Sequence, residues 1–576
     1  MQKLGTIAVL LFLFSTVSFS QMFSVPDGAT MVADTLGAQD LPKVAASPDG
    51  SSYVSWFDLR GKGYALYIQR LNPEGEPLFA PQGLLVSGHP QATSLSDYDL
   101  KCDKEGNAII AFTDYRTGGP DIFVYKISPK GEFLWENDGI KISQSTGNYQ
   151  AQPKIAITED GCATVAWTNS QGNQRYAIQR LSSDGKKLWG DAPTYYGHRE
   201  ASFEVPQPVP SDSNSVIVIY NVVTGNFPQL NVAIAAEKFS AQGRAIWGHG
   251  LVYVQSLGHV MPFTPPSVRA DGENGAVIAW HDDRDTDNKM VAYAQKLNSN
   301  GTFEFPLNGA EVASVEGNSY NPIAVRLGVT REVMVNWKGT DRSQSESGLF
   351  AQILDERGGK KLGDGGMAVI PVSQQSITDY NLTSIGNAAY IASVSGSHPN
   401  KDGYLDLNVL TSAGIMNWQG AGLIAENEGA KGRLEMVTAP FNSCLMAFTV
   451  GLKKGESVWA AKRNYNGNPG GIFSPVNLID FRAWNMGPEV VISWATNHEE
   501  GKWKFKLERR TVDSDWTTVK EVEGTGGFYT VANYEFTDKA PGDTRMVYRL
   551  IAKGPKGDEI AWDLGQVIDT SYPIVK

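Results

Sequence analysis

An Asp-x-Arg loop recurs along this chain of 576 residues. Its copies, the last two of them shifted, are Asp58/Arg60, Asp114/Arg116, Asp283/Arg284 and Asp341/Arg342. A carboxylate and a guanidinium at this spacing can form a bidentate ion pair, either around a binding site or as a tie between loops. Because a single active site rarely needs several equal copies, the recurrence favours a structural tie to the neighbouring repeat.

The densest acidic loop, HDDRDTDN, starts at His281. Its carboxylates Asp283, Asp285 and Asp287 stand at alternating positions, where they could supply oxygen ligands to calcium. The EF-hand pattern fails, because no Gly follows at the sixth position and no Glu at the twelfth. A solvated loop is therefore favoured over a metal site. We expect no cofactor, with calcium at these three residues as the alternative.

The known catalytic motifs are missing from the sequence. It contains no HExxH zinc motif, no GxSxG elbow and no phosphate-binding loop. The runs SPDG, DKEG and TEDG invite comparison with the Asp-boxes of sialidases, but Trp56 follows Ser47 too late for that motif, so we interpret these runs as turns. Paired carboxylates for glycoside hydrolysis cannot be identified from sequence. We therefore name no catalytic residue and lean toward a protein that is not an enzyme, without settling the point.

Seven aromatic residues mark a long internal repeat. Each ends a short apolar run, and one further unit, the seventh in chain order, has Ser393 in the same place. Intervals between consecutive units are 53 to 60 residues. These marker residues are Trp56, Phe112, Trp167, Tyr220, Trp280, Trp337 and Phe448. A polar loop, a second apolar run such as YALYIQRL and a Gly-centred turn follow each marker. Three or four short strands at a period near fifty residues predict the blades of a β-propeller.

The two ends of the repeat region suggest how the ring closes. The eighth unit stops at RNYNGNPGG and lacks the final strand of the others. A matching segment, FSVPDGATMVA, lies near the start of the chain, and its Asp27-Gly28 aligns with Asp138-Gly139. An N-terminal strand that completes the last blade would remove the open sheet edges. We therefore favour eight blades, with seven as the alternative.

The region after Pro475 has a different pattern. Short alternating strands with turn signals every eight to twelve residues predict an antiparallel β-sandwich, with Trp494 and Tyr548 in its core. VVISWAT, FKLERR, YEFTD and YRL resemble fibronectin type III-like domains, in particular those near the C-termini of exported proteins of Bacteroidota. The repeats are similar to those of secreted bacterial β-propellers of unassigned function. That resemblance implies fold and export, but no particular reaction.

The N-terminus predicts export. MQKLGTIAVLLFLFSTVSFSQ has a basic start, a short apolar stretch and small residues before Gln21, as a secretory signal peptide does. We therefore expect a signal peptide at 1–20, a propeller at 21–472 and the sandwich at 473–576. No later segment is apolar enough to cross a bilayer. We expect the mature protein outside the cell, at its surface or in the periplasm.

Composition narrows the function. A net charge of -12 argues against a nucleic-acid partner, which requires a basic surface. Three cysteines rule out a disulfide framework. We expect a non-catalytic binding or scaffolding protein whose propeller loops present a protein or glycan ligand. The alternatives are a glycan-degrading hydrolase or lyase with its site in the propeller funnel, and an accessory subunit of an envelope secretion or motility machine. The sequence does not indicate the oligomeric state.

Overall fold

The computed structural model describes residues 29–569, with gaps. The gaps are residues 92–96, 145–148, 171–174, 248–250, 263, 314, 329, 374–375, 397–402, 418–422, 426–428, 441, 453–454, 465–475, 487–488, 500–501, 512–513, 526–531, 540–544 and 555–558. The proposed signal peptide therefore lies outside the described residues, as does the predicted boundary between the propeller and the sandwich.

Eight antiparallel sheets form the first part of the chain, and each is one blade of a propeller. Blade 1 consists of β2 (Gln39–Ala46), β3 (Ser52–Asp58), β4 (Tyr64–Leu71) and β5 (Leu84–Gln91), and blade 2 of β6 (Asp99–Cys102), β7 (Ala108–Asp114), β8 (Asp121–Ile127) and β9 (Ile140–Lys141). Blade 3 consists of β10 (Tyr149–Ile157), β11 (Ala163–Ser170), β12 (Arg175–Leu181) and β13 (Thr194–Tyr196). Blade 4 consists of β14 (Ser202–Pro210), the 3₁₀ turn η2 (Asp212–Asn214), β15 (Val216–Asn226), β16 (Gln229–Phe239) and β17 (Val252–Gln255).

The remaining four blades repeat this order, except that the last one takes its outer strand from the N-terminus. Blade 5 consists of β18 (Ser267–Ala270), β19 (Ala276–Asp282), β20 (Val291–Leu297) and β21 (Ala310–Glu311), and blade 6 of β22 (Ser319–Arg326), β23 (Val333–Thr340), β24 (Ser347–Leu354) and β25 (Met367–Ser373). Blade 7 consists of β26 (Ser376–Ile385), β27 (Ala388–Gly396), β28 (Tyr404–Thr411), β29 (Met416–Asn417) and β30 (Leu423–Ala425). Blade 8 consists of β31 (Lys431–Ala439), β32 (Ser443–Leu452), β33 (Gly455–Asn464) and β1 (Ala29–Ala33).

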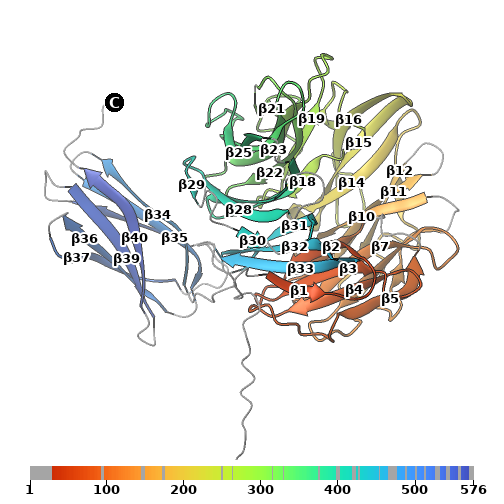
Figure 1. The fold of residues 1–576 in the computed structure, drawn as a ribbon, viewed down its shortest axis with the longest axis horizontal. Coiled ribbons are helices and arrows are strands. Elements are labelled where there is room, and N and C mark those ends of the chain that lie inside the picture. Colours follow the sequence, from red (N-terminus) through yellow and green to blue (C-terminus); the bar gives the residue numbers. More distant parts are fainter. Residues whose placement is uncertain are drawn as a thin grey trace, which may run out of the picture.

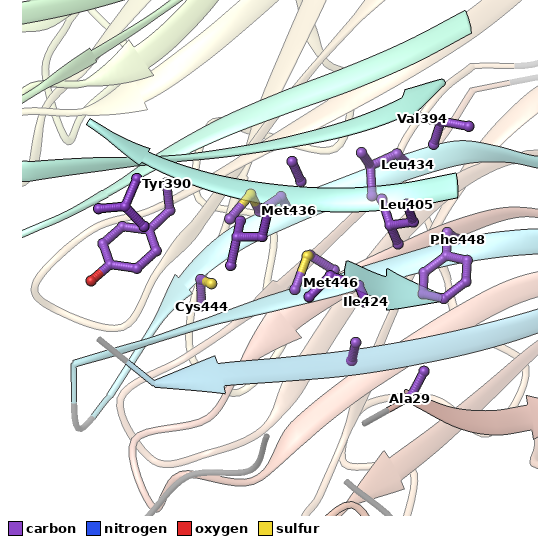
Figure 2. Packing of buried hydrophobic residues seen from close by; sticks show 14 of the residues in the cluster. Ala29, Tyr390, Val394, Leu405, Ile424, Leu434, Met436, Cys444, Met446 and Phe448 are labelled. Atoms are coloured by element: carbon purple, nitrogen blue, oxygen red, sulfur yellow. The ribbon is translucent and has the colours of Figure 1, made fainter. Parts of the chain in front are cut away.

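The ring closes through β1, so the prediction of eight blades is confirmed and the alternative of seven is wrong. β1 pairs antiparallel with β33, with Ala29 opposite Ala461 and Met31 opposite Trp459. In Figure 1 the red β1 lies beside the blue β33. The first strand of every blade packs against the next blade around the ring, and β2 of blade 1 packs against β31 and β32 of blade 8. Figure 2 shows Ala29 of β1 near Phe448 and Met446 of blade 8, with residues of blade 7 packed beyond them.

The second strand of a blade explains the apolar runs of the sequence. β3, β7 and β19 are buried at every position, because each lies between two neighbouring blades. Such strands must be apolar on both faces, so they show a continuous run in place of an alternating pattern. All seven marker aromatics lie on second strands and are at most 2% exposed.

Glycines shape the pocket for several of these aromatics. Gly309 has φ +88°, and a Cβ atom placed on it would lie 2.5 Å from Cη2 of Trp280. Gly83 has φ +92°, and a Cβ atom placed on it would likewise lie 2.5 Å from Cη2 of Trp56. These turns therefore need glycine both for their left-handed backbone and for the close approach of the indole.

Ser393 occupies the marker position of blade 7, on β27, and its buried hydroxyl has no hydrogen-bond partner among the described residues. A buried polar group without a partner lowers stability. We expect Ser393→Ala to raise the free energy of unfolding by about 1 kcal/mol, measured by denaturant unfolding. Ser55 is the matched control, because its buried hydroxyl lies 3.0 Å from the hydroxyl of Tyr98. Ser55→Ala should lower stability; a gain in both variants would contradict the prediction.

Buried cations on third strands tie each of several blades to the next. They are Arg70, Lys126, Arg180, Lys238 and Lys462. Lys126 forms an ion pair with Asp103 at 2.9 Å, in the DKEG turn of its own blade, and donates to the carbonyl of Ser183 in blade 3 at 3.2 Å. Lys462 donates to the carbonyl of Gly50 at 2.9 Å and so links blade 8 to blade 1. The acidic-Gly runs are therefore turns whose acids hold these cations.

Two packed sheets form the C-terminal sandwich, the second unit in Figure 1. One sheet has the order β34 (Val476–Met486), β35 (Glu489–Glu499), β38 (Ala532–Asp538), and the other has the order β37 (Thr517–Glu523), β36 (Lys504–Thr511), β39 (Arg545–Lys553), β40 (Glu559–Asp569). Trp494 and Tyr548 lie in the core between them, and the hydroxyl of Tyr548 donates to Asp538 at 3.0 Å. The predicted β-sandwich is confirmed.

Candidate functional site

A channel of about 820 Å³ runs along the propeller axis. Its wall is made by the innermost strands of all eight blades: β2, β6, β10, β14, β18, β22, β26 and β31. Each innermost strand pairs with only one other strand, so one of its edges faces the channel. The channel is therefore a common surface to which all eight repeats contribute.

A backbone bulge directs side chains in several of these strands. In β2 the pairing shifts between Asp40 and Lys43, and Leu41 has φ +49°. Equivalent shifts occur in β10, β14, β22 and β31. The hydroxyl of Tyr98, in the next blade, donates to the carbonyl of Leu41 at 2.9 Å and holds the bulge. Bulges of this kind re-aim side chains near functional sites, and Lys43 lines the channel.

Lys43 and Lys154 are held in a chain of ion pairs at one end of the channel. Asp97 contacts Lys43 at 3.1 Å and Lys154 at 2.5 Å, and Lys43 also pairs with Glu435. Burial alone would raise the pKa of Asp97, but the two lysine charges outweigh it and hold that pKa well below its usual range. Burial alone would lower the pKa of Lys43, but the charges of Glu435 and Asp97 outweigh it and raise that pKa above its usual value.

The other carboxylates that line the channel are also engaged. Asp99 accepts from the backbone N–H of Leu100 at 3.0 Å and of Ile155 at 2.8 Å. Asp271 accepts from the N–H groups of Glu273 and Gly275 at 2.7 and 2.8 Å. Carboxylates fixed in this way hold the wall together and are poorly placed to exchange protons with a substrate.

Arg269, on β18, is the exception among the cations of the channel. Five cationic side chains line it. Four have a carboxylate within 4 Å in the described part of the chain, as Lys101 has Asp99 at 2.9 Å and Arg326 has Glu273 at 2.7 Å. Arg269 has none there, and its one hydrogen bond runs from Nη2 to Oδ1 of Asn381 at 2.9 Å. Burial lowers the pKa of Arg269, with an opposing contribution from the more distant charge of Glu435.

The Asp-x-Arg loops lie away from the channel wall and form compact ion pairs. Arg60 pairs with Asp58 at 2.5 Å, donates to the carbonyl of Gln82 at 2.9 Å and lies over the ring of Tyr67 at 3.8 Å. Arg116 pairs with Asp114 in the same way. Both guanidiniums therefore fasten the loop between second and third strands to the outer turn of their own blade. Arg116 also donates to the hydroxyl of Ser87 in blade 1 at 3.1 Å, which is the expected tie to the neighbouring repeat.

The pairing that we inferred in blades 5 and 6 is wrong. Arg284 pairs with Asp282 at 2.8 Å, so Asp283 is not its partner. Asp282 is two residues after Trp280, as Asp58 is after Trp56, and it also accepts from Gln255 of blade 4 at 3.1 Å. Asp341 caps its own loop through the N–H groups of Ser343 and Glu346, and no ion pair with Arg342 is present among the described residues.

The carboxylates of the acidic loop after β19 accept hydrogen bonds from backbone N–H groups of the same loop. Asp283 accepts from the backbone N–H groups of Asp287 and Asn288 at 3.0 and 3.2 Å. Asp287 accepts in turn from Lys289 at 3.0 Å. Among the described residues no group of three His, Cys, Asp or Glu side chains is gathered closely enough to hold a metal ion, and Asp283, Asp285 and Asp287, the alternative calcium ligands, are not gathered in this way.

His281 is a core residue of blade 5. Its Nδ1 accepts from the backbone N–H of Asn321 at 3.3 Å, and its ring meets Tyr320 edge-on. Burial lowers the pKa of His281 to about 4, against the opposing charge of Asp282. The imidazole is therefore neutral at physiological pH.

We expect this histidine to make stability depend on pH. Because its pKa is lower in the folded chain than the usual 6.5 or so, its contribution is complete above pH 6.5 and is lost as the pH falls toward 4. The loss amounts to about 3 kcal/mol. Urea unfolding at pH 7.5 and 4.5 should show a smaller decrease for His281→Gln, which keeps an acceptor without the titration. Equal decreases in both proteins would contradict this assignment.

The three cysteines are unpaired, and Cys162 and Cys444 are buried. Burial raises the pKa of Cys444 to about 12, which makes it an unreactive core thiol. Within the described residues, no helix is long and apolar enough to span a membrane.

Comparisons with known proteins give structural neighbours only. No family model matches the sequence, and neither does any curated protein. Similar solved structures include a protein of unknown function from Dyadobacter fermentans (11% identity, 56% of this chain and 96% of that chain, TM-score 0.35), the Dos1 propeller (13%, 75% and 94%, 0.39) and an ulvan lyase of a polysaccharide lyase family (10%, 74% and 96%, 0.37). These similarities are too low to support a shared activity, and we assign the fold from the strand pairing.

The sequence did not lead us to predict Arg269 or the wall of the channel as a candidate site. The position of Arg269 corresponds to Ala45 in blade 1, Ala156 in blade 3 and Val325 in blade 6, each two residues after the site where the innermost strand resumes regular pairing. Lys101 of blade 2 stands at the same position, so a cation where several repeats have a small apolar residue would have narrowed the search to these two residues.

Proposed function

We propose that this protein is a non-catalytic binding module of the cell envelope or exterior, and that its ligand enters the central channel. The observation that carries the proposal is the contrast inside the channel. The carboxylates of the described lining are engaged with a cation or with backbone N–H groups, while Arg269 has no carboxylate within 4 Å among the described residues. A wall of this kind can hold a ligand but offers no acid–base pair.

The proposed location rests on the sequence. Residues 1–20 have the pattern of a secretory signal peptide, and the sandwich resembles fibronectin type III-like domains of exported proteins of Bacteroidota. The sandwich would then serve as a spacer or as a dock for an envelope partner. The ligand is a protein or a glycan.

A blocked channel tests the proposal. Ala270 lines the channel and is exposed there, so Ala270→Trp would obstruct it. Ala368, exposed on the outermost strand of blade 6, gives the control Ala368→Trp. The mature chain from Gln21 and both variants would be used to capture partners from envelope and culture fractions and to probe a glycan array.

We expect one protein or one glycan class to bind the unmodified chain and Ala368→Trp, and binding to fall at least tenfold for Ala270→Trp. Equal capture by all three proteins would reject the channel as the binding site. A stoichiometric protein partner unaffected by Ala270→Trp would favour the alternative of an accessory subunit in an envelope machine.

A glycan-degrading enzyme is the second candidate, and Glu456 is the residue that favours it. Burial raises the pKa of Glu456, and the nearby charge of Asp40 raises it further. General acid catalysis of glycoside cleavage uses a carboxyl group whose pKa is raised and that lies near a second carboxylate. Glu456 is the second residue of β33 and is not part of the described channel wall. Turnover of a polysaccharide that is lost in Glu456→Gln but kept in Ala270→Trp would support this candidate over the binding module.

A further inference from the structure

The half-buried Arg269 guanidinium has no carboxylate in contact with it among the described residues, and Glu435 acts on it only from a greater distance. Its side chain lines the channel between the innermost strands of blades 5 and 7. Asn381 of blade 7 supplies a neutral oxygen at 2.9 Å, and no carboxylate lies within 4 Å of Arg269 among the described residues. A charge removed from water is costly unless an opposite charge accompanies it. The channel therefore holds a place where an anion would be stabilised.

Asn381 fixes the direction of the guanidinium. Its Oδ1 accepts both from Arg269 and from the backbone N–H of Leu382 at 2.9 Å, and its Nδ2 donates to the carbonyl of Leu434 at 3.2 Å. Only Nη2 of Arg269 takes part in this network. The remaining N–H groups of the guanidinium have no hydrogen-bond partner in the described part of the chain, so they are available to a ligand.

The surroundings favour a carboxylate on an organic ligand over a bare inorganic anion. The planar fork of an arginine matches the two oxygens of a carboxylate. Val268, Ile155 and Met436 line the same channel and offer aliphatic contacts for the body of such a ligand. No aromatic residue is present in the described lining, so stacking against a neutral sugar ring has no platform there.

We propose that Arg269, oriented by Asn381, is an anion-binding site in the central channel that takes a carboxylate group of an organic ligand. This inference rests on the proposed function, because it names the chemistry by which the channel would hold its ligand. It adds a residue, an orienting partner and a ligand class that the shape of the channel alone does not give.

Calorimetric titration of the mature protein with sodium citrate tests the site, at an ionic strength held constant with sodium chloride. Sodium sulfate and sodium phosphate titrations run in parallel. We expect saturable binding of citrate, at least tenfold weaker in Arg269→Gln. Arg357 is an exposed arginine on a turn of blade 6, and Arg357→Gln should bind as the unmodified chain does.

Asn381→Asp provides a second variant that leaves the arginine in place. A carboxylate at this position would neutralise Arg269 from within the chain, so citrate binding should fall at least tenfold although the cation is still present. Arg269→Leu should fold and show a higher Tm than the unmodified chain without citrate, by about 2 °C or more, because a half-buried charge without a carboxylate in contact is removed. A merely structural arginine would instead lower the Tm when replaced.

The outcomes separate the site from the function. Absence of saturable binding, or equal binding by Arg269→Gln, would overturn the site. Saturation by sulfate or phosphate without saturation by citrate would overturn the carboxylate assignment. If Ala270→Trp abolishes partner capture while Arg269→Gln leaves it intact, the channel function stands and this inference fails. If citrate binds through Arg269 while Ala270→Trp leaves capture unchanged, the site stands and the proposed function fails.

Discussion

A chain that begins at Asp34, without β1, is expected to lose most of the stability of its propeller. β1 supplies the fourth strand of blade 8, and its removal leaves the backbone edge of β33 unpaired. Val32 and Ala33 are buried against the core that includes Trp56. Burial of one valine contributes roughly 1.5–3 kcal/mol. With the lost backbone pairing, we expect a decrease on the order of 5 kcal/mol, a large part of the stability of an ordinary domain.

Thermal unfolding and size-exclusion chromatography of the truncated chain, beside a chain from Gln21, would measure this effect. We expect a lower Tm and soluble aggregates, because an exposed strand edge is a template for pairing with other molecules. A synthetic peptide of residues 21–37 added in trans should restore part of the Tm. A truncated chain that remains monomeric with an unchanged Tm would show that β1 is dispensable.

Trp280→Ala is expected to destabilise the propeller by about 3–5 kcal/mol, the range for loss of a large buried aromatic side chain. Trp280 is 2% exposed and stacks on Tyr293 at 6.2 Å between ring centroids. Its Nε1 donates to Asp282 at 2.9 Å, and Arg284 lies over Tyr293 at 3.3 Å. The substitution therefore opens a cavity and removes a donor from a buried carboxylate. Denaturant unfolding would measure the change.

Trp337 offers a comparison within the same chain. It occupies the equivalent place in blade 6 and stacks on Phe350 at 5.8 Å between ring centroids, but its Nε1 has no acceptor in the part of the chain that the structure describes. Replacement by phenylalanine should therefore cost about 1–2 kcal/mol less at Trp337 than at Trp280, where a hydrogen bond to a charged group is lost. Equal costs for Trp337→Phe and Trp280→Phe would show that the indole hydrogen bond contributes nothing.

The repeat could be predicted from the sequence because its physical causes are local. A second strand buried on both faces must be apolar throughout, so Trp56 and Phe112 stand at the end of recognisable runs. The closing strand could also be predicted, because the last unit lacked a piece that the N-terminus contains. Asp282 was overlooked because Asp283 follows it directly, and only the distance from Trp280 distinguishes the two.

The candidate site could not be predicted in the same way, because it depends on residues from different blades. Arg269 and Asn381 lie far apart in sequence, and the ring of blades brings them within hydrogen-bond distance. The bridge from Lys43 through Asp97 to Lys154 likewise joins three blades or their connections. Pairing of charges in space determines which cation is left unmatched, and a single sequence does not contain that information.

The pairing of β1 with β33 also sets an order of events during synthesis. β1 is the first described strand to be made, and its partner is the last strand of the propeller. Until Gly455–Asn464 leaves the ribosome, β1 has no strand to join, and blades 1 to 7 can assemble only as an open arc. Contacts this distant in sequence form slowly because the intervening loop must close first. A nascent or prematurely terminated chain that lacks β33 therefore cannot form the β1–β33 pairing that closes the ring. Ring closure can follow only after the whole propeller has been translated.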